Sequence, residues 1–461
     1  MAIIVNSFSH RLFPGFKTES SHGDPSLTAQ TYRLNRALAD PDLSVMKFLN
    51  EVKVNYPQSI SFSAGRPAEA FFNLPERLEN IQHFLQVTAA HSGVESTELW
   101  GSFGQYGKTD GLICDLLSDH LAKDEGINAQ PGDIVVTTGC QEAMALVLMT
   151  LFRDEGDCLL TPDPTYIGIT GLAKILGIQT VPIACDDDGM NLEALEVALQ
   201  KLSQQGKRPK ALYIIPDFNN PLGCDMPLAH RKHLLSLAEK HRFFIVEDNP
   251  YGAFVFEGER LPTLKALDQG NWVIYLGTFS KTLFPSLRLG FAVTSAQLRD
   301  DSGKLQALSE ELVKVKSLTT VNTCALSQAV VGGELMACQG RLYAHLAEHI
   351  AYYRERRDAM LGALEKAFPP GDKWRELVHW NRPRGGFFMT LTLPFPFDNR
   401  ALHKCVEKFG VVVVPMQYFS LLRNRSHQVR LSFCSNSLIE IQEGIQKFTQ
   451  FIREFGSEPL T

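Results

Sequence analysis

The sequence predicts an α/β protein, in which a large and mostly parallel sheet covered by helices is joined to a smaller α+β unit. Two observations support this prediction. Between about residues 110 and 295, short β-rich runs alternate with stretches of helical periodicity, which is typical of parallel sheets with helices on both faces. Beyond about residue 335, a charged helical segment is followed by separate short β-rich runs, which is typical of a smaller α+β unit.

The large sheet is expected to contain seven strands, and Gly or Pro usually stands at or just beyond their ends. These strands are predicted at residues 134–138, 158–161, 179–183, 211–216, 243–247, 272–277 and 290–294. Before them, residues 26–54 have the composition of helices. After them, a helix is expected over 341–368, followed by β-rich runs at 385–393, 411–415 and 429–433 with a helix after the first of these runs.

The composition excludes several classes of protein. Lys and Arg number 45 against 51 Asp and Glu, so no basic excess suggests binding to nucleic acid or to an anionic membrane. The nine cysteines form no CxxC pair and no zinc-spaced ladder, which indicates reduced thiols, a cytoplasmic protein and no metal site. No basic leader of a secretory signal is expected at the N-terminus, and the least charged stretches, 317–333 and 411–422, are too polar or too short to span a membrane.

Nucleotide-binding fingerprints are also missing from the sequence. Gly107-Lys108-Thr109 resembles the end of a P-loop, but Ser102 stands where that loop requires a glycine. No GxGxxG motif follows any of the predicted strands.

Polar residues follow the predicted strands, at the ends where open α/β sheets bind their ligands. They form five groups, which are Gly139-Cys140-Gln141, Asp163 to Tyr166, Asn219-Asn220-Pro221, Asp248 to Tyr251, and Ser280-Lys281. This clustering is the main indication of a functional site.

Lys281 follows the predicted strand 272–277. Most loop lysines simply point to solvent, but Thr278, Ser280 and Arg288 surround this one with hydroxyls and a fixed cation suited to phosphate. A lysine among cations and dipoles has a depressed pKa and can act as an amine nucleophile. An amine nucleophile beside a phosphate cradle suggests a Schiff base to pyridoxal phosphate.

The other candidate residues have structural alternatives. Asp248 either shapes a turn or pairs with a protonated pyridine nitrogen, and Arg430 either forms a structural ion pair or binds the α-carboxylate of a substrate. Residues that could equally shape a turn, pack in the core or begin a helix are Asn220, Tyr251, Tyr166, Gly139, Cys140 and Gln141.

Four motifs occur in a characteristic order, which is NNPLG, EDNPY, TFSK with Arg288 seven residues after Lys281, and VRLSF. Together they make residues from about Ser61 to Phe451 resemble fold-type I pyridoxal-phosphate enzymes, the class I/II aminotransferases. The similarity is greatest to the branch of α-aminoadipate, kynurenine and aromatic aminotransferases. The resemblance implies a large domain with a mixed, mostly parallel seven-stranded sheet and a smaller α+β domain. The expected divisions are residues 1–85 for the N-terminal segment and part of the small domain, 86–334 for the large cofactor-binding domain and 335–461 for the C-terminal small domain.

The resemblance also implies roles for individual residues. Lys281 would carry the cofactor and move a proton between the substrate Cα and the cofactor C4′. Asp248 would bind the pyridine nitrogen, Asn220 and Tyr251 the ring oxygen, and Tyr166 would stack on the ring. The phosphate would be held by Gly139, Cys140, Gln141, Thr278, Ser280 and Arg288. Tyr106 would reach the phosphate of a neighbouring subunit, which implies a homodimer with shared active sites.

Substrate contacts are expected from Arg430, Asn220 and the segment containing Gly65, which would close over the substrate. The sequence departs from the family pattern at Cys140, where a small hydroxyl residue is usual, at Thr278, where Ser is common, and at residues 284–286, where a Pro-Gly turn is usual. Arg66 stands where a small residue is frequent. It is either a surface arginine or a residue that favours a polar or acidic group on the substrate.

The predicted activity is transfer of an amino group from an L-amino acid, aromatic or long-chain, to a 2-oxo acid such as 2-oxoglutarate or pyruvate. Phe71, Phe72 and Phe103 are compatible with such a donor, although a place in the core explains each of them as well. The alternatives are a lyase, decarboxylase or oxidase reaction with the same cofactor, and a non-enzymatic sensor that binds pyridoxal phosphate. The absence of a winged-helix segment before the domain disfavours the regulator relatives of the family.

Overall fold

The computed structural model describes residues 33–45, 56–299 and 302–458. Contacts within the chain define two units, Met1–Ala39 and Asp40–Thr461. The described part of the first unit contains a short 3-10 turn, η1 (Arg36–Ala39). The predicted helical stretch 26–54 lies largely outside the described residues. Its described part contains η1 and a second 3-10 turn, η2 (Pro41–Ser44).

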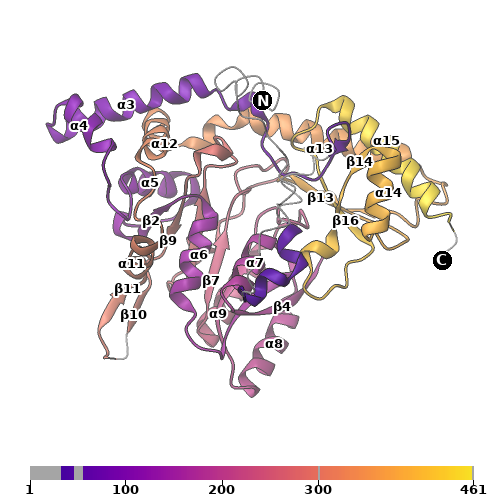
Figure 1. Cartoon of the computed structure of the whole chain (residues 1–461), viewed down its shortest axis with the longest axis horizontal. Coiled ribbons are helices and arrows are strands. Elements are labelled where there is room, and N and C mark those ends of the chain that lie inside the picture. The colour runs from indigo at the N-terminus through magenta and orange to yellow at the C-terminus, as the bar shows by residue number, and fades with distance from the viewer. Residues whose placement is uncertain (1–32, 46–55, 300–301, 459–461) are drawn as a thin grey trace, which may run out of the picture. The chain divides into compact units, whose positions relative to one another are not determined.

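The main sheet contains all seven predicted strands and one short additional strand (Figure 1). In spatial order, the strands are β2 (Ile134–Thr137), β9 (Gly290–Val293), β8 (Val273–Thr278), β7 (Phe244–Asp248), β6 (Arg208–Ile214), β3 (Asp157–Asp163), β4 (Gln179–Asp186) and β5 (Gly189–Met190). The strands from β8 to β4 run parallel, and β9 is antiparallel to both of its neighbours. The sheet is therefore mixed and mostly parallel, as predicted. The additional strand β5 pairs with β4 through two residues only, too few to produce a recognisable sequence pattern.

Helices cover both faces of this sheet because alternate residues of its strands are apolar on opposite sides. Leu159 packs with α6 (Cys140–Leu151) and α7 (Ile167–Ile175). Leu160, the next residue, packs instead with α8 (Leu192–Gln204) and α9 (Leu228–His241). The central strands β3, β7 and β8 are thus buried on both sides.

A second group of helices packs beside strands β2 and β9. These elements are α3 (Leu74–Ser92), α4 (Ser96–Phe103), α5 (Cys114–His120), the π-helix η4 (Leu121–Glu125), α10 (Leu264–Leu267), α11 (Leu308–Thr319) and α12 (Ala325–Ala337), with the hairpin β10 (Gln297–Arg299) and β11 (Leu305–Ala307). Helices α3 and α12 approach closely because α12 carries Gly332 and Gly333. A Cβ at Gly333 would lie 2.1 Å from the backbone oxygen of Asn80 in α3.

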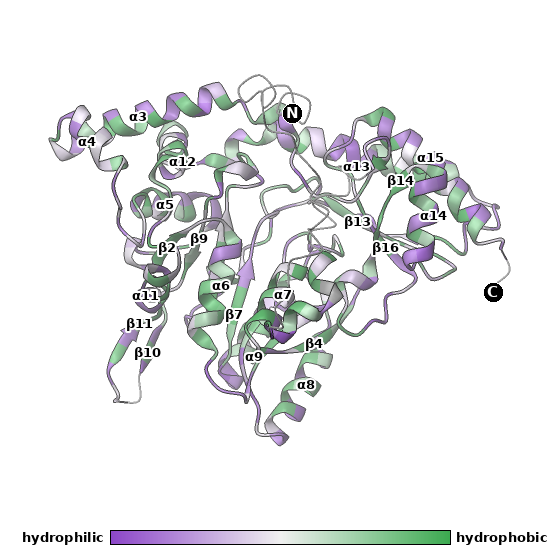
Figure 2. Cartoon of the chain, viewed as in Figure 1, coloured by the Kyte–Doolittle hydropathy of each residue, from purple (hydrophilic) through white to green (hydrophobic). Residues whose placement is uncertain are grey.

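The smaller unit has a four-stranded antiparallel sheet in the order β12 (His379–Trp380), β13 (Phe388–Thr392), β16 (Gln428–Ser432) and β15 (Val414–Pro415). Its helices are α13 (Ala347–Ala367), α14 (Asn399–Phe409) and α15 (Leu438–Phe455). The predicted helix over 341–368 is divided, because a 3-10 turn, η7 (Leu342–His345), precedes α13. The hydrophilic and hydrophobic residues of α14 and α15 alternate in Figure 2, which fits helices that bury one face.

An early segment of the chain pairs with a late one in this smaller unit. Strand β1 (Ile60–Ser61) pairs in parallel with β14 (Val411–Val412). The chain then continues from β1 towards the ends of the main-sheet strands, so this pairing places residues 62–68 at the candidate site. Among the described residues, none of the helices is both long and apolar enough to cross a membrane.

Candidate active site

The site lies where the strands of the main sheet end. Asp248 ends β7, Thr278 ends β8, and Lys281 follows three residues later. Helix α6 begins at Cys140 after β2, and Tyr166 is the N-cap of α7 after β3. The sheet order therefore brings together the groups that the sequence predicted at these ends.

Lys281 has the environment of a reactive amine. Its Nζ donates a hydrogen bond of 2.8 Å to the backbone oxygen of Gly65 and lies 5.9 Å from the centre of the Tyr251 ring. Burial and, to a smaller extent, the neighbouring guanidinium groups of Arg430 and Arg288 lower the pKa of Lys281 to about 8, against the opposing influence of Cys434 and Asp248. A larger fraction of this amine is therefore uncharged at neutral pH than for an ordinary lysine.

The Asp248 carboxylate is buried, and only one of its two oxygens has a hydrogen-bond partner among the described residues. Its Oδ2 accepts a hydrogen bond of 2.6 Å from the Tyr213 hydroxyl. Its Oδ1 is buried and has no hydrogen-bond partner among the described residues. Burial raises the pKa of Asp248 to about 6, and the bond from Tyr213 opposes this rise. Because an unpaired buried carboxylate oxygen is costly, Oδ1 fits a charged donor such as a protonated ring nitrogen.

Tyr213 is a residue of the site that the sequence did not predict. The residue lies inside the predicted strand 211–216, in the run ALYIIP. The one signal was a hydroxyl group in an otherwise apolar central strand, since such a group needs a buried partner.

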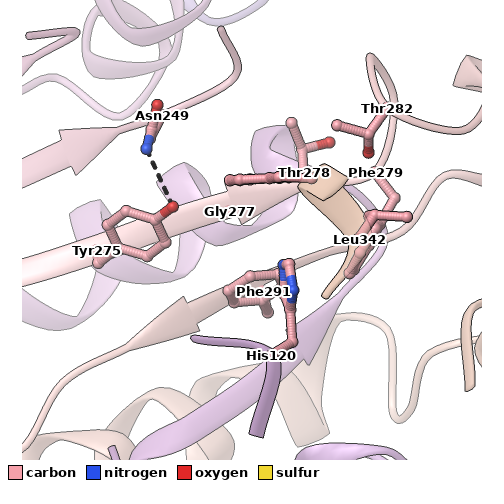
Figure 3. Close-up of a pocket in the computed structure, with 10 residues that line it drawn as sticks. His120, Asn249, Tyr275, Gly277, Thr278, Phe279, Thr282, Phe291 and Leu342 are labelled. Carbon is pink, nitrogen blue, oxygen red and sulfur yellow. Dashed lines mark hydrogen bonds between the residues drawn. The ribbon is translucent and has the colours of Figure 1, made fainter. Parts of the chain in front are cut away.

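Asn249 fixes the turn that follows Asp248. Its Nδ2 donates to the Tyr275 hydroxyl at 3.1 Å (Figure 3). Its Oδ1 accepts from the Gly252 amide at 3.0 Å. A Cβ at Gly252 would lie 2.4 Å from that Oδ1, so the turn requires glycine there. The small cavity drawn in Figure 3 is lined by Thr278, Thr282 and His120 among others, but not by Lys281 or Asp248.

The start of α6 can hold a phosphate group. Gly139, its N-cap, has φ +77°, a conformation that favours glycine. The guanidinium of Arg288 lies over it, so that a Cβ at Gly139 would be 2.6 Å from Arg288 Nη2. The first amides of a helix have no partner within the helix and bind anions. Amides and guanidinium together form a site that a side chain at position 139 would fill.

The hydroxyls after β8 belong to the same region. Thr278 Oγ1 lies 3.1 Å from Ser280 Oγ and accepts from the Ser280 amide at 3.1 Å. Residues 284–286, where the family usually has a Pro-Gly turn, lead into the 3-10 turn η6 (Pro285–Leu287), after which Arg288 has a left-handed backbone with φ +48°. The Cys140 thiol donates to the Gly277 oxygen at 3.2 Å, so the side chain at this unusual position already has a partner.

Arg430 is a buried cation without a carboxylate partner in the described part of the chain. Its Nη1 donates to Asn220 Oδ1 at 2.7 Å, and its Nη2 donates to the backbone oxygen of Ser63. Its Nε is buried without a partner. Burial lowers the pKa of Arg430 to about 10, which leaves it charged at neutral pH. The structural ion pair considered for this residue is therefore not observed, and the guanidinium fits an incoming carboxylate.

Four consecutive backbone oxygens of residues 63–66 are held by side chains of the site. Arg430 binds that of Ser63, and Lys281 that of Gly65. Ser432 donates to the Ala64 oxygen at 3.0 Å, and Cys434 to the Arg66 oxygen at 3.0 Å. Gly65 has no room for a side chain, because a Cβ there would lie 2.3 Å from the Phe388 ring. The roles of Ser63, Ser432 and Cys434 could not be predicted from the sequence, although Ser432 lies in the VRLSF motif, because these contacts involve backbone oxygens.

The remaining candidates are at the site or on the surface. The Tyr166 hydroxyl donates to Gln141 Oε1 at 3.3 Å, beside the start of α6. Tyr251 is buried against Phe387 and Phe388. Tyr106 is 84% exposed, and Arg66 is also exposed.

Three phenylalanines that sequence reasoning associated with the substrate pack against other rings. The ring of Phe71 stacks on His349, that of Phe72 lies against Phe284, and that of Phe103 lies against Phe84. Packing therefore accounts for all three.

Comparison with known proteins shows which family the chain resembles in sequence. A sequence model of the family described as "Aminotransferase class I and II" matches residues 79–448. The chain is 37% identical to an (S)-3,5-dihydroxyphenylglycine transaminase of Amycolatopsis orientalis, over 98% of either chain. It is 33% identical to aromatic-amino-acid aminotransferase 1 of Thermococcus litoralis, over 93% of this chain and 96% of that one.

Solved structures agree with these sequence similarities. The crystal structure of a kynurenine aminotransferase of Pyrococcus horikoshii, in complex with PMP, has a TM-score of 0.78 and 32% identity, and the match covers 93% of this chain and 98% of the other. The structure of LysN, an α-aminoadipate aminotransferase of Thermus thermophilus, has a TM-score of 0.74 and 27% identity, over 92% of this chain and 100% of that one. That protein is complexed with N-(5'-phosphopyridoxyl)-L-leucine.

Proposed function

The chain belongs to the class I and II aminotransferases, which depend on pyridoxal phosphate, and we propose that its amino donor is an aromatic L-amino acid. The activity itself is transfer of an amino group from an amino acid to a 2-oxo acid. The lyase, decarboxylase, oxidase and sensor alternatives are set aside, because all four proteins compared above are aminotransferases.

The residues of the site fit this cofactor. Asp248 Oδ1 would accept from the ring nitrogen, Tyr166 would stack on the ring, and Asn220 and Tyr251 would contact the ring oxygen. The phosphate would be held by the first amides of α6, at Gly139, Cys140 and Gln141, and by Thr278, Ser280 and Arg288. When bound, the cofactor holds the amino group covalently and withdraws electrons from the substrate Cα.

Lys281 would act as the base of the reaction. With a pKa lowered to about 8, its Nζ can take a proton from the substrate Cα and return it at the cofactor C4′. Arg430 would hold the substrate carboxylate, which fixes the Cα near Lys281. The oxygens of Ser63 and Gly65, which contact these two cations in this structure, would give way to substrate.

The observation that favours an aromatic donor is the surroundings of Arg430. Its guanidinium lies 4.4 Å from the centre of the Phe388 ring and 4.7 Å from that of Phe419. Phe419 also packs with Leu222, Val414, Met416 and Val45. A substrate bound by Arg430 would lie close to the rings of Phe388 and Phe419, which suit an aromatic group. The names of two relatives, a dihydroxyphenylglycine transaminase and an aromatic-amino-acid aminotransferase, support the same class.

A panel of amino donors tests this proposal. The enzyme in its pyridoxal form is mixed with single donors, and conversion of the bound cofactor to its amine form is followed by absorbance. We expect phenylalanine and tyrosine to convert it faster than alanine, and only a 2-oxo acid to restore the starting spectrum. Faster conversion by alanine than by every aromatic donor would contradict the aromatic assignment.

We further propose that 2-oxoglutarate or pyruvate is the acceptor. The same panel with Arg66→Ala tests whether Arg66 favours an acidic group, since its loss would then slow 2-oxoglutarate and leave pyruvate unchanged.

We also propose that the protein is a homodimer in which Tyr106 reaches the phosphate of the other subunit. In support, Tyr106 is 84% exposed and follows α4, where Trp100 is 46% exposed. Nearby helices expose further apolar side chains, at Leu74, Leu78 and Leu326. A second copy of the chain would cover such a surface.

Sedimentation and cofactor binding test the dimer. The holoenzyme is expected to sediment at twice the chain mass. Tyr106→Phe, which removes only the hydroxyl, is expected to weaken cofactor binding by about 10- to 150-fold, as for loss of a hydrogen bond to a charged group, without changing the oligomeric state. A monomeric holoenzyme, or unchanged cofactor affinity in Tyr106→Phe, would contradict the shared site.

Two further assignments remain proposals. We place the large domain at residues 86–334, with 1–85 and 335–461 contributing the N-terminal segment and the small domain. In support, the main sheet lies within 134–293 and the small sheet within 379–432. We also propose a cytoplasmic location, for which the nine cysteines without a pairing pattern are the support.

A further inference from the structure

Tyr213 is fully buried in the centre of the main sheet. It belongs to β6, whose neighbour β7 ends at Asp248. The 2.6 Å bond from its hydroxyl to Asp248 Oδ2 has the length expected when a hydroxyl donates to a charged carboxylate. The other oxygen, Oδ1, is buried and unpartnered in the described structure. One oxygen of the Asp248 carboxylate therefore has a hydrogen-bond partner, and the other has none among the described residues.

This asymmetry has a geometric consequence. The last torsion of an aspartate side chain is broad, so an isolated carboxylate does not keep one orientation. A donor fixed in a central strand binds one oxygen and thereby fixes the direction of the other. We propose that Tyr213 is a positioning residue, which holds Asp248 in its charged form with Oδ1 turned towards the ring nitrogen of the cofactor. This inference rests on the proposed function of Asp248.

The electrostatics of the pair agree with this role. Burial raises the pKa of Asp248 to about 6. The Tyr213 hydrogen bond acts in the opposite direction because it stabilises the charged form, and the Cys140 thiol and the charge of Lys281 also lower this pKa. Burial, with the charge of Asp248, keeps the pKa of Tyr213 well above its ordinary value, so the hydroxyl remains a donor. The other titratable groups around Asp248 are the thiol of Cys140 on α6, the hydroxyls of Tyr166 and Tyr251, and the cations of Lys281 and Arg288.

Removal of the Tyr213 hydroxyl should therefore make Asp248 a weaker acid. A hydrogen bond to a charged group contributes about 1.5–3 kcal/mol, which corresponds to about 1–2 pH units. In the cofactor-free protein, infrared difference spectra against Asp248→Asn isolate the band of the protonated carboxyl. We expect its titration midpoint near pH 6 in the wild type. For Tyr213→Phe, the reference spectrum is that of Tyr213→Phe/Asp248→Asn. The midpoint of Tyr213→Phe is expected about 1–2 pH units above that of the wild type.

Tyr275→Phe is the matched control. It removes a buried hydroxyl from β8, the strand on the other side of β7, where the hydroxyl contacts Asn249 and not Asp248. Its midpoint should equal that of the wild type. An equal midpoint in Tyr213→Phe and the wild type would overturn the inference, as would an equal rise in both variants.

Cofactor binding supplies a second measurement. At pH 6, Tyr213→Phe is expected to bind pyridoxal phosphate about 5- to 50-fold more weakly than Tyr275→Phe, because a rise of 1–2 pH units in the pKa of Asp248 from about 6 lowers the charged fraction of its carboxyl group by about that factor. If the wild type binds the cofactor and is converted by amino donors while Tyr213→Phe binds equally well, the inference fails and the proposed function stands. If the wild type does not bind the cofactor, the proposed function itself fails.

Discussion

Lys281→Ala is expected to abolish steady-state transamination while leaving the fold intact. Loss of a positioned general base alone costs about 10²–10⁴-fold in rate. The substitution also removes the amine that tethers the cofactor, so the total loss should exceed this range. The fold should tolerate the change, because the Lys281 Nζ makes one hydrogen bond to the Gly65 oxygen and lies 5.9 Å from the centre of the Tyr251 ring, contacts that contribute little to core packing. Turnover with phenylalanine and 2-oxoglutarate, with circular dichroism for folding, measures the effect.

The control for this variant is Lys174→Ala. Lys174 is a partly exposed lysine near the end of α7, and it pairs with Asp40. Its replacement should change turnover less than about threefold, because this ion pair is partly exposed, contributes little to stability, and does not involve the residues of the candidate site. Turnover by Lys281→Ala within tenfold of the wild type would be incompatible with a catalytic role for this residue.

Arg430→Gln is expected to reduce kcat/KM for the amino donor by about 30- to 4000-fold. The range corresponds to the 2–5 kcal/mol found when one partner of a buried, hydrogen-bonded charge pair is removed. Glutamine can still donate to Asn220 or to the Ser63 oxygen, so these local contacts are partly kept. Arg430→Lys retains the charge but lacks the planar fork, and it should recover only part of the loss.

Inhibition by an unreactive aromatic acid separates carboxylate binding from catalysis. 3-Phenylpropionate has the ring and the carboxylate of the donor but no amino group. Its inhibition constant should rise in Arg430→Gln in parallel with the loss in kcat/KM. As a control, Arg453→Gln removes an arginine on α15 that pairs with Asp372, and it should change neither value more than threefold. An unchanged inhibition constant in Arg430→Gln would show that the carboxylate binds elsewhere.

The predictable part of the fold is the part set by local patterns. The seven strands of the main sheet are apolar runs between helical stretches, and periodicity identifies them without knowledge of distant contacts. Strand β5 has two residues and exists only because it folds back on β4. The pairing of Ile60–Ser61 with Val411–Val412 depends on contacts between residues about 350 positions apart, which no local pattern encodes.

The candidate site also contains residues that local sequence predicts and residues that depend on distant contacts. The groups at strand ends, such as Asp248, Thr278 and Lys281, were recognisable because the chemistry of each residue and its place after a strand agree. Tyr213 was missed because its partner lies on the adjacent strand, 35 residues away in the sequence. The oxygens of residues 63–66 were missed because a backbone contact leaves no mark on residue type. The structure also shows that the Phe71, Phe72 and Phe103 rings pack against other rings, a role that composition alone does not distinguish from substrate binding.

The pKa of Lys281, lowered to about 8, also has a measurable consequence. Only an uncharged amine attacks an aldehyde, so attachment of pyridoxal phosphate to the cofactor-free protein should accelerate as the pH rises and level off above about pH 8. An ordinary lysine, with a pKa of about 10.4, would continue to accelerate across this range.

Borohydride reduction of the reconstituted protein, followed by peptide mass spectrometry, identifies the residue that carries the cofactor. We expect one phosphopyridoxyl group per chain, on Lys281, and no modification of this peptide when the cofactor is first converted to its amine form by an amino donor. A protein that remains colourless after reconstitution, or a label fixed on another lysine, would contradict the assignment of Lys281 and with it the proposed reaction.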